Sequence, residues 1–147
     1  MTITHNGEEY GVIISQGLDG MDDIIKLRTE VFVEEQGFEN EFDDTDNIAA
    51  HCLLTKNGLP AATGRAYVSD GIMHIGRIAV VKSMRGMGLG SAVLRVLEGY
   101  ARDQGHEKTA LSAQCRVKGF YEANGYHAEG NIYYDEYCPH IMMYKDL

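Results

Sequence analysis

Residues 85–91, Arg-Gly-Met-Gly-Leu-Gly-Ser, join an apolar segment directly to an amphipathic one, and this turn limits the possible folds more than any other segment. Its three glycines stand at alternate positions and carry no Cβ atoms, so a ligand can approach the backbone closely. Apolar residues recur at helical spacing from Leu89 to about residue 104, which predicts a helix that begins at the turn. The free N–H groups and the dipole of that helix form an anion site, and Arg85 adds a cation. The alternative is a plain flexible connection.

The glycine turn does not match the common nucleotide-binding motifs. A Walker A loop requires Gly-Lys-Ser or Gly-Lys-Thr, and the sequence contains neither triplet. The dinucleotide motif Gly-x-Gly-x-x-Gly fails as well, because counting from Gly86 or from Gly88 puts Ser91 or Val93 at the third glycine position. The turn therefore predicts a phosphate site of another kind.

The remaining chain predicts one mixed α/β domain over residues 1–147, with a largely antiparallel first half. The residues of the strand at 72–81 alternate between two faces, so Ile78 and Val80 are expected on the face of His74, opposite Met73. The expected elements are a strand around 12–14, a helix over about 20–36 ended by Gly37, a hairpin of strands 49–55 and 60–69 turning at Asn57-Gly58, a strand at 72–81, a helix to about 104, a strand at 109–113, a short helix at 117–124, and one or two strands within 126–145.

Composition excludes several classes of protein. The formal net charge of −9 disfavours nucleic acid as a partner, and it either favours a cationic partner or serves solubility alone. Three cysteines, without any Cys-x-x-Cys pair, indicate neither a disulfide framework nor a zinc site. No two histidines stand at ligand spacing on a helix, so no metal is expected. The polar N-terminus and the lack of a run of about 18 apolar residues predict a cytoplasmic protein without a membrane segment.

Arg85, Gly88 and Gly90 form an Arg-x-x-Gly-x-Gly pattern that resembles the pyrophosphate-binding signature of the GNAT superfamily of acyl-CoA-dependent N-acetyltransferases. Residues 76–80, Gly-Arg-Ile-Ala-Val, are similar to the central strand of that family, and residues 120–126 are similar to its Phe-Tyr-Glu-x-x-Gly-Phe segment. These elements occur in the order and at the spacing of the family.

Four further segments resemble the small ElaA-like branch of the superfamily. They are Arg28-x-x-Val-Phe-Val-x-Glu-Gln36, Asp43-Asp-x-Asp46 before Ala50-His51, Leu111-Ser-Ala-Gln114, and Pro139-His-Ile-Met142. The resemblance implies an α/β (α+β) fold with a mixed, largely antiparallel sheet that splays at its central strand and has helices on both faces. It also implies acetyl-CoA as co-substrate, without a metal, and acetyl transfer to a small amine or to an amino-terminal or lysyl group by direct attack in a ternary complex.

The resemblance also implies roles for individual residues. Ile78 and Val80, with Ala79 between them, would supply the freed backbone groups that pair with the pantetheine arm, and the Val80 N–H would stabilise the oxyanion. Tyr121 matches the general acid that protonates the departing thiolate; the alternative is an aromatic core residue. The other residues implied in cofactor binding are Arg85, Gly86, Met87, Gly88, Leu89, Gly90, Ser91, Gln114, Phe120 and Tyr121 itself.

The general base is not assigned by the resemblance. Many members of the family use a glutamate on the central strand, but residues 72–81 contain no carboxylate. The candidates for the base are Glu35, His51, His74 and His140. The candidates for holding the acceptor are Arg28, Gln36 and Arg65.

Residues 34–46 contain seven carboxylates and no Lys or Arg. Such a run is either a solvated loop or an electrostatic funnel that attracts a cationic amine. The missing strand glutamate also leaves a second function open, a non-catalytic acyl-CoA-binding sensor or regulatory module. The protein is expected to be a monomer or a homodimer, since its last strands offer an edge for pairing.

Overall fold

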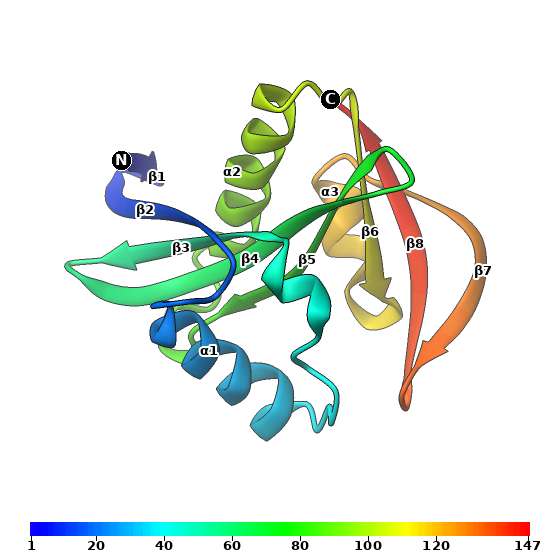
Figure 1. Cartoon of the computed structure of the whole chain (residues 1–147), viewed down its shortest axis with the longest axis horizontal. Coiled ribbons are helices and arrows are strands. Elements are labelled where there is room, and N and C mark those ends of the chain that lie inside the picture. The colour runs from blue at the N-terminus through cyan, green and yellow to red at the C-terminus, as the bar shows by residue number, and fades with distance from the viewer.

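A computed structural model describes the whole chain, residues 1–147 (Figure 1). Its eight strands form one sheet in the order β1-β2-β3-β4-β5-β6-β8-β7. The strands are β1 (Thr2–His5), β2 (Glu8–Gln16), β3 (Ala50–Lys56), β4 (Leu59–Ser69), β5 (Ile72–Val80), β6 (Lys108–Gln114), β7 (His127–Asp135) and β8 (Cys138–Asp146). The helices are α1 (Asp22–Arg28), the π-helix η1 (Thr29–Glu35), α2 (Leu89–Asp103) and α3 (Lys118–Ala123), with short 3-10 turns η2 (Asp44–Asn47), η3 (Lys82–Met84) and η4 (Cys115–Val117).

The sheet is divided between β5 and β6. These two parallel strands pair only at their beginnings, where Met73 faces Thr109 and His74 faces Ala110, whereas all other neighbouring strands are antiparallel. Beyond those pairs the strands diverge, and Figure 1 shows β1 to β5 separating from the unit formed by β6, β8 and β7. The predicted mixed, largely antiparallel sheet that splays at its central strand is therefore confirmed.

A β-bulge in β5 lies at the start of the divergence. Thr63 of β4 faces Ala79, but Arg65 faces Gly76, so β5 holds one residue more than β4 in this stretch. The extra residue falls around Arg77, whose φ of 53° lies in the left-handed region. A bulge bends the strand and increases its twist, which turns the end of β5 away from β6.

The bulge also corrects the predicted two faces of β5. Ile78 and Val80 pack against the same apolar cluster as Met73, and Ala79 packs in the cluster on the other side of the sheet. The expectation that Ile78 and Val80 share a face with His74 is therefore wrong. Strict alternation cannot anticipate this change, because an extra residue shifts the alternation by one position.

Helices cover both faces of the sheet, as predicted. The apolar side of α2, with Val93, Leu94 and Leu97 fully buried, packs on β4 and β5 in the larger of two core clusters. Leu27 of α1 and Phe32 of η1 belong to the smaller cluster, on the opposite face. The end of β5 thus lies between α2 on one face of the sheet and η1 on the other. A ligand bound at this end would contact both helices.

Most predicted elements are confirmed within a few residues, including the hairpin at Asn57-Gly58, the strand at 72–81 and the helix that starts at Leu89. Three features differ. The expected helix over 20–36 consists of α1 followed by the π-helix η1, the N-terminal hairpin adds β1, and the acidic run contains η2. None of the helices combines the length and the hydropathy that a membrane crossing requires.

Candidate active site

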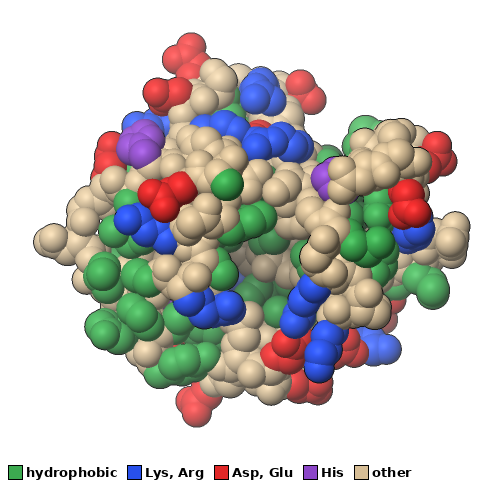
Figure 2. Space-filling model, turned by 180° about the vertical axis from the view of Figure 1, so that it is seen from behind, with side chains coloured by type: hydrophobic (Ala, Val, Ile, Leu, Met, Phe, Trp, Pro, Cys, Tyr) green, Lys and Arg blue, Asp and Glu red, His purple; other side chains and the backbone are tan.

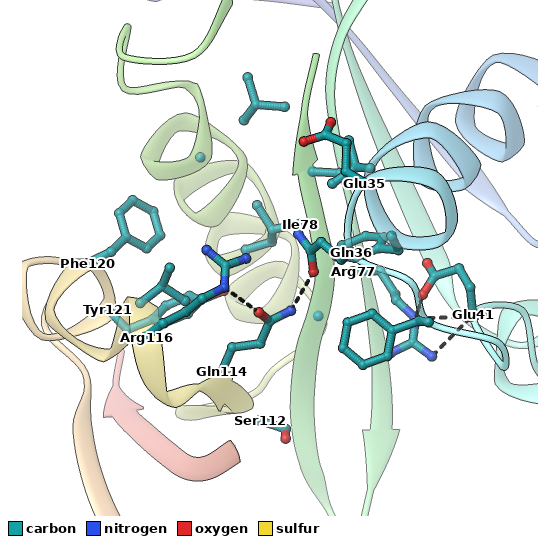
Figure 3. Close-up of a pocket in the computed structure, with 18 of the residues that line it drawn as sticks. Glu35, Gln36, Glu41, Arg77, Ile78, Ser112, Gln114, Arg116, Phe120 and Tyr121 are labelled. Carbon is teal, nitrogen blue, oxygen red and sulfur yellow. Dashed lines mark hydrogen bonds and ion pairs between the residues drawn. The ribbon is translucent and has the colours of Figure 1, made fainter. Parts of the chain in front are cut away.

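A cavity of about 780 Å³ follows β5 from the glycine turn to the turn between β7 and β8. It lies where β5 and β6 separate, and its walls come from η1, β5, the glycine turn, the end of β6 and α3. The close-up in Figure 3 shows α3 on one side of this space, η1 on the other, and β5 between them. Figure 2 shows one face of the molecule hollowed near its middle, with Lys and Arg side chains around the hollow.

The glycine turn forms one end of the cavity. Gly88 is the N-cap of α2 and has a φ of 76°, which glycine adopts without strain. Gly90 is needed for a different reason, since a Cβ atom there would lie 3.1 Å from the Phe120 ring. The first-turn N–H groups of α2 have no intrahelical acceptor, so they and the positive end of the helix dipole favour an anion here.

The turn is supported from outside by the tip of the β1–β2 hairpin. His5 Nε2 and Asn6 Nδ2 donate hydrogen bonds of 3.1 and 3.2 Å to the backbone carbonyl of Met87. This contact engages the Met87 carbonyl outside the cavity. Met87 and Ser91 are the two predicted cofactor-binding residues that do not line the cavity; all the others do.

The end of β5 presents free backbone groups to the cavity. Val81 N–H donates to Ala61 C=O at 2.9 Å, so Val80 occupies a non-hydrogen-bonded position opposite Ala62. The Val80 N–H and C=O therefore point away from β4, toward the space where β6 has diverged. A ligand with amide groups can pair with these positions as an additional strand does.

Arg85 makes a bidentate ion pair with Glu35 across the mouth of the cavity. Its Nη1 and Nη2 donate to the two carboxylate oxygens at 2.9 and 2.6 Å, and its Nε donates to the Val80 carbonyl at 3.2 Å. The hydrogen bond from Arg85 lowers the pKa of Glu35, and the same bond raises the pKa of Arg85. Glu35 is therefore ionised at neutral pH. Its partner Arg85 is the residue that the sequence predicts to bind a pyrophosphate.

A chain of three side chains crosses the cavity beside β5 (Figure 3). Arg116 Nε donates to Gln114 Oε1 at 2.9 Å, and Gln114 Nε2 donates to Gln36 Oε1 at 2.9 Å. Gln114 comes from the end of β6 and Gln36 from the end of η1, so the chain connects the two halves of the divided sheet. The Gln114 amide can give up its hydrogen bond to Gln36 and bond an amide of a bound ligand instead.

Tyr121 lies on α3 at the wall of the cavity, next to Phe120. Its ring packs edge-on against Phe120 and Tyr126, while its hydroxyl makes no hydrogen bond within the chain. Burial raises the pKa of Tyr121 to about 12, against a smaller opposing effect of Arg116. The phenol is therefore protonated over the whole physiological range and is available as a proton donor.

The three histidine candidates lie in different environments. His140 lines the cavity, and its Nδ1–H donates to the Cys138 carbonyl at 2.9 Å. Because a carbonyl only accepts, the proton is on Nδ1 and the neutral ring keeps a lone pair on Nε2. His51 and His74 lie outside the cavity. His51 is buried and donates to the Asp46 carbonyl, and His74 stacks on Tyr67; burial lowers the pKa of both.

Two carboxylates of the acidic run, Glu41 and Asp46, are buried in a network with arginines. Arg28 is buried and binds Glu41 and Asp46 at 2.8 Å, and Arg65 binds Asp46 at 2.7 Å. Arg28 and Arg65, which the sequence suggested for the acceptor, are thus committed to this network and do not line the cavity. Burial raises the pKa of Glu41, whereas Asp46 has a pKa of about 2, because its arginine partners outweigh the effect of burial.

A contact between the β7–β8 turn and residues 36–40 closes one side of the cavity, and we call it the β7–β8 clasp. The Glu136 carboxylate accepts hydrogen bonds from the backbone N–H groups of Glu39 and Asn40 at 2.9 and 3.0 Å. Tyr137 donates its hydroxyl proton to the Gln36 carbonyl and stacks on Phe38 with ring centroids 5.3 Å apart. The clasp joins the two halves of the sheet at the end away from the glycine turn.

Sequence reasoning missed several polar residues that line the cavity. They are Asn40, Glu41, Arg77, Ser112, Arg116, Asp135 and Glu136. Arg77 carried a usable signal, because it is the one charged residue within the apolar strand β5. Its guanidinium holds the Glu41 side chain at 3.0 Å and the Glu41 carbonyl at 3.0–3.1 Å, which anchors the acidic run to the bulge. The others are brought to the cavity only by the fold.

Comparison with known proteins assigns the family. Residues 16–147 match the model of the acetyltransferase (GNAT) domain. An uncharacterized N-acetyltransferase of Bacillus subtilis, YjcF, is 33% identical over 137 residues, which cover 91% of this chain and 98% of that protein. The Escherichia coli protein ElaA is 28% identical over 131 residues, covering 84% of this chain and 86% of ElaA.

Solved structures agree with this assignment. A crystal structure of an acyl-CoA N-acyltransferase from Pseudomonas aeruginosa superposes with a TM-score of 0.83 at 26% identity, covering 92% of this chain and 99% of that one. The crystal structure of E. coli ElaA has the same fold, with a TM-score of 0.80 at 24% identity, covering 99% of this chain and 100% of that one. The chain therefore belongs to the GNAT acetyltransferase family, as an acyltransferase of the branch that includes ElaA.

Proposed function

We propose that the protein transfers the acetyl group of acetyl-CoA to an amine by direct attack, with both substrates bound together in the cavity. The observation that carries the proposal is the convergence of three features in one space: the anion site of the glycine turn, the backbone N–H of Val80 that points away from β4, and the unpaired hydroxyl of Tyr121. Each feature suits one part of an acyl-CoA, namely its pyrophosphate, its pantetheine amides and its thioester.

The residues of the cavity fit such a ligand. The glycine turn and Arg85 would hold the pyrophosphate, since helical N–H groups and a guanidinium are the usual donors for it. Ile78, Val80 and Gln114 would pair with the pantetheine amides. Acetyl-CoA supplies the activated acyl group when it is bound, and the remaining chemistry belongs to the protein.

Two groups of the protein would stabilise the charge that develops during transfer. The Val80 N–H points into the cavity and can donate to the oxygen of the acyl carbonyl as that oxygen becomes negative. A well-placed donor of this kind contributes about 3–4 kcal/mol to the transition state. Tyr121 can donate its phenolic proton to the thiolate, because its raised pKa keeps that proton on the oxygen at neutral pH.

His140 is the proposed proton acceptor for the attacking amine. An amine is mostly protonated at neutral pH and must lose a proton before it attacks. The Nδ1–H of His140 is held by the Cys138 carbonyl, which leaves Nε2, a nitrogen without a hydrogen bond in the chain, as the atom that would accept the proton. His51 and His74 have no access to the cavity, and Glu35 is engaged by Arg85. His140 is therefore the base that the geometry supports best.

The acceptor end of the cavity supports an amine substrate. Asp135 lines it and has no cationic partner within the chain, so its carboxylate can attract an ammonium group. The β7–β8 clasp narrows this end, which favours a small amine over a lysine on a folded protein surface.

The experiment is a screen for amine-dependent release of the CoA thiol, with the acetylated product identified by mass spectrometry. The panel should contain polyamines, amino acids, aminosugars and short peptides with a free amino terminus or a lysine. An acetylated product formed only with the protein supports the proposal. Binding of acetyl-CoA without turnover across the panel would favour the sensor module instead.

A further inference from the structure

The ion pair between Glu35 and Arg85 has a consequence for ligand binding. Arg85 is the only arginine of the glycine turn, and Glu35 engages both of its terminal nitrogens. Its Nε is engaged by the Val80 carbonyl. A guanidinium presents five N–H donors in a fixed plane, and the bidentate fork that faces Glu35 is the one that best matches a phosphate. A pyrophosphate and the Glu35 carboxylate would therefore bind the same terminal N–H groups of Arg85.

Gln36 also occupies a group that would otherwise be available to a ligand. Gln36 follows Glu35 at the end of η1, and its amide oxygen accepts the Nε2–H of Gln114. Two consecutive side chains at the end of η1 thus bind groups that suit an acyl-CoA, and Gln36 reaches across the divided sheet to do so. Figure 3 shows Glu35 and Gln36 on the η1 side of the cavity, with Gln36 bonded to Gln114.

We infer that Glu35 competes with the pyrophosphate of acyl-CoA for Arg85, so that cofactor binding releases the end of η1. This inference rests on the proposed function, because it requires an acyl-CoA in the cavity. Glu35 is then a residue that tunes cofactor affinity, and it acts through Arg85. The π-helical geometry of η1 is consistent with this role, since such segments frequently mark functional sites.

The strength of the competition is bounded by the exposure of the pair. Both side chains are nearly 40% exposed, and exposed ion pairs contribute little to stability. A ligand with two phosphates can therefore displace Glu35 from Arg85 at a small cost in free energy. The displaced carboxylate still lies near the pyrophosphate and repels it. Removing the carboxylate should strengthen CoA binding by about 3- to 10-fold.

The test is calorimetric titration of CoA into the wild type and the Glu35→Gln and Glu34→Gln variants. Glu34 is the matched control, because it is the adjacent carboxylate, is exposed and makes no ion pair. We expect Glu35→Gln to bind CoA about 3- to 10-fold more tightly, and Glu34→Gln to bind like the wild type. Pantetheine, which has no pyrophosphate, should bind all three proteins equally.

A double-mutant cycle with Arg85→Gln assigns the effect to the ion pair. If Glu35 acts mainly through Arg85, Glu35→Gln should gain clearly less CoA affinity in the Arg85→Gln background than in the wild type, because only the repulsion between the carboxylate and the pyrophosphate remains to be relieved. Equal or weaker CoA binding by Glu35→Gln in the wild-type background would overturn the inference, as would an equal gain in the Arg85→Gln background. A wild type that does not bind CoA would instead overturn the proposed function, so the two failures are distinguishable.

Discussion

The Glu136 carboxylate accepts a hydrogen bond of 2.9 Å from the backbone N–H of Glu39, and this contact joins the two halves of the divided sheet. The second oxygen accepts the N–H of Asn40. The sheet itself does not connect these halves beyond the start of β5 and β6. The β7–β8 clasp therefore closes the end of the cavity away from the glycine turn, through side chains of a turn.

We expect Glu136→Ala to open the clasp. The amides of Glu39 and Asn40 lose their acceptor, so their hydrogen exchange should accelerate several-fold, measured by mass spectrometry on a peptide that covers residues 37–42. Glu129→Ala is the control, because Glu129 is an exposed carboxylate on β7 that contacts only His127. Unchanged exchange in the Glu136 variant would show that the hydrogen bonds do not hold this segment.

The clasp should also depend on pH. The backbone N–H groups of Glu39 and Asn40 lower the pKa of Glu136. A lowered pKa means that the contribution of Glu136 is present above its unfolded pKa and is lost as the pH falls through the folded pKa. The exchange rates are first corrected for their intrinsic pH dependence. The difference in exchange rate between the wild type and Glu136→Ala should then become smaller as the pH falls. A difference that grows as the pH falls would contradict this assignment.

Arg28→Met should strongly destabilise the fold. Arg28 is buried, and its removal takes from the buried carboxylates of Glu41 and Asp46 one of the two arginines that each of them binds. Breaking a buried ion pair from one side costs about 3–5 kcal/mol. The free energy of unfolding should fall by that amount in urea titrations at pH 7, while Lys26→Met, an exposed substitution on the same helix, should change it by less than about 0.5 kcal/mol. A loss below about 1 kcal/mol would exclude the network as a main support.

Asp46 gives this network a defined dependence on pH. Its pKa of about 2 lies below the ordinary value of 3.8, so its contribution is present above pH 3.8 and is lost as the pH falls toward 2. The shift corresponds to about 2 kcal/mol at pH 7, of which roughly half is lost by pH 3. Glu41 acts in the opposite direction, because burial raises its pKa. In urea titrations from pH 3 to pH 7, the free energy of unfolding of Asp46→Asn should fall less toward acid pH than that of the wild type. An unchanged pH profile would contradict the assignment.

Tyr121→Phe should lower kcat and leave CoA affinity nearly unchanged. Loss of a general acid costs about 10²–10⁴ in rate, whereas the phenyl ring keeps its packing against Phe120. With the wild-type enzyme, ionisation of the phenol should not limit kcat below about pH 10, since burial raises the pKa of Tyr121 to about 12. Tyr100→Phe is the control, as that hydroxyl bonds Gln16 outside the cavity. Equal activity of Tyr121→Phe and the wild type would remove Tyr121 from the mechanism.

His140→Gln should reduce kcat/KM for the amine by about 10²-fold or more at pH 7. The deficit should narrow as the pH rises, because a growing share of the amine is already neutral and needs no base. CoA affinity should stay the same. His127→Gln, an exposed histidine that contacts Glu129, provides the control. A deficit that is constant with pH would indicate that His140 positions the acceptor and does not accept its proton.

Local patterns in the sequence predicted most of the fold. The strand at 72–81, the turn at Asn57-Gly58 and the helix after Leu89 are each predicted from neighbouring residues, and each is confirmed. The face change in β5 could not be predicted in this way. It depends on one additional residue near Arg77 relative to β4, which becomes visible only when the two strands are paired.

The acidic run shows the same limit for the site. A run of carboxylates without Lys or Arg predicts a solvated or steering surface, yet Glu41 and Asp46 are buried against Arg28. Their partners lie far away in the sequence, so no local window contains both charges. The glycine turn, in contrast, could be interpreted as an anion site because the strand, the turn and the helix follow one another directly in the chain.

The central claim is that the cavity along β5 binds acetyl-CoA, and thermal unfolding tests it most directly. The midpoint should be measured with acetyl-CoA, CoA, ATP and NAD at matched millimolar concentration. A ligand at 100 times its Kd stabilises the folded state by about 2.7 kcal/mol, which raises the midpoint by several degrees. We expect that rise with acetyl-CoA and CoA and not with ATP or NAD. An unchanged midpoint with both CoA species would contradict the assignment of the glycine turn to a pyrophosphate, and with it the proposed acetyl transfer.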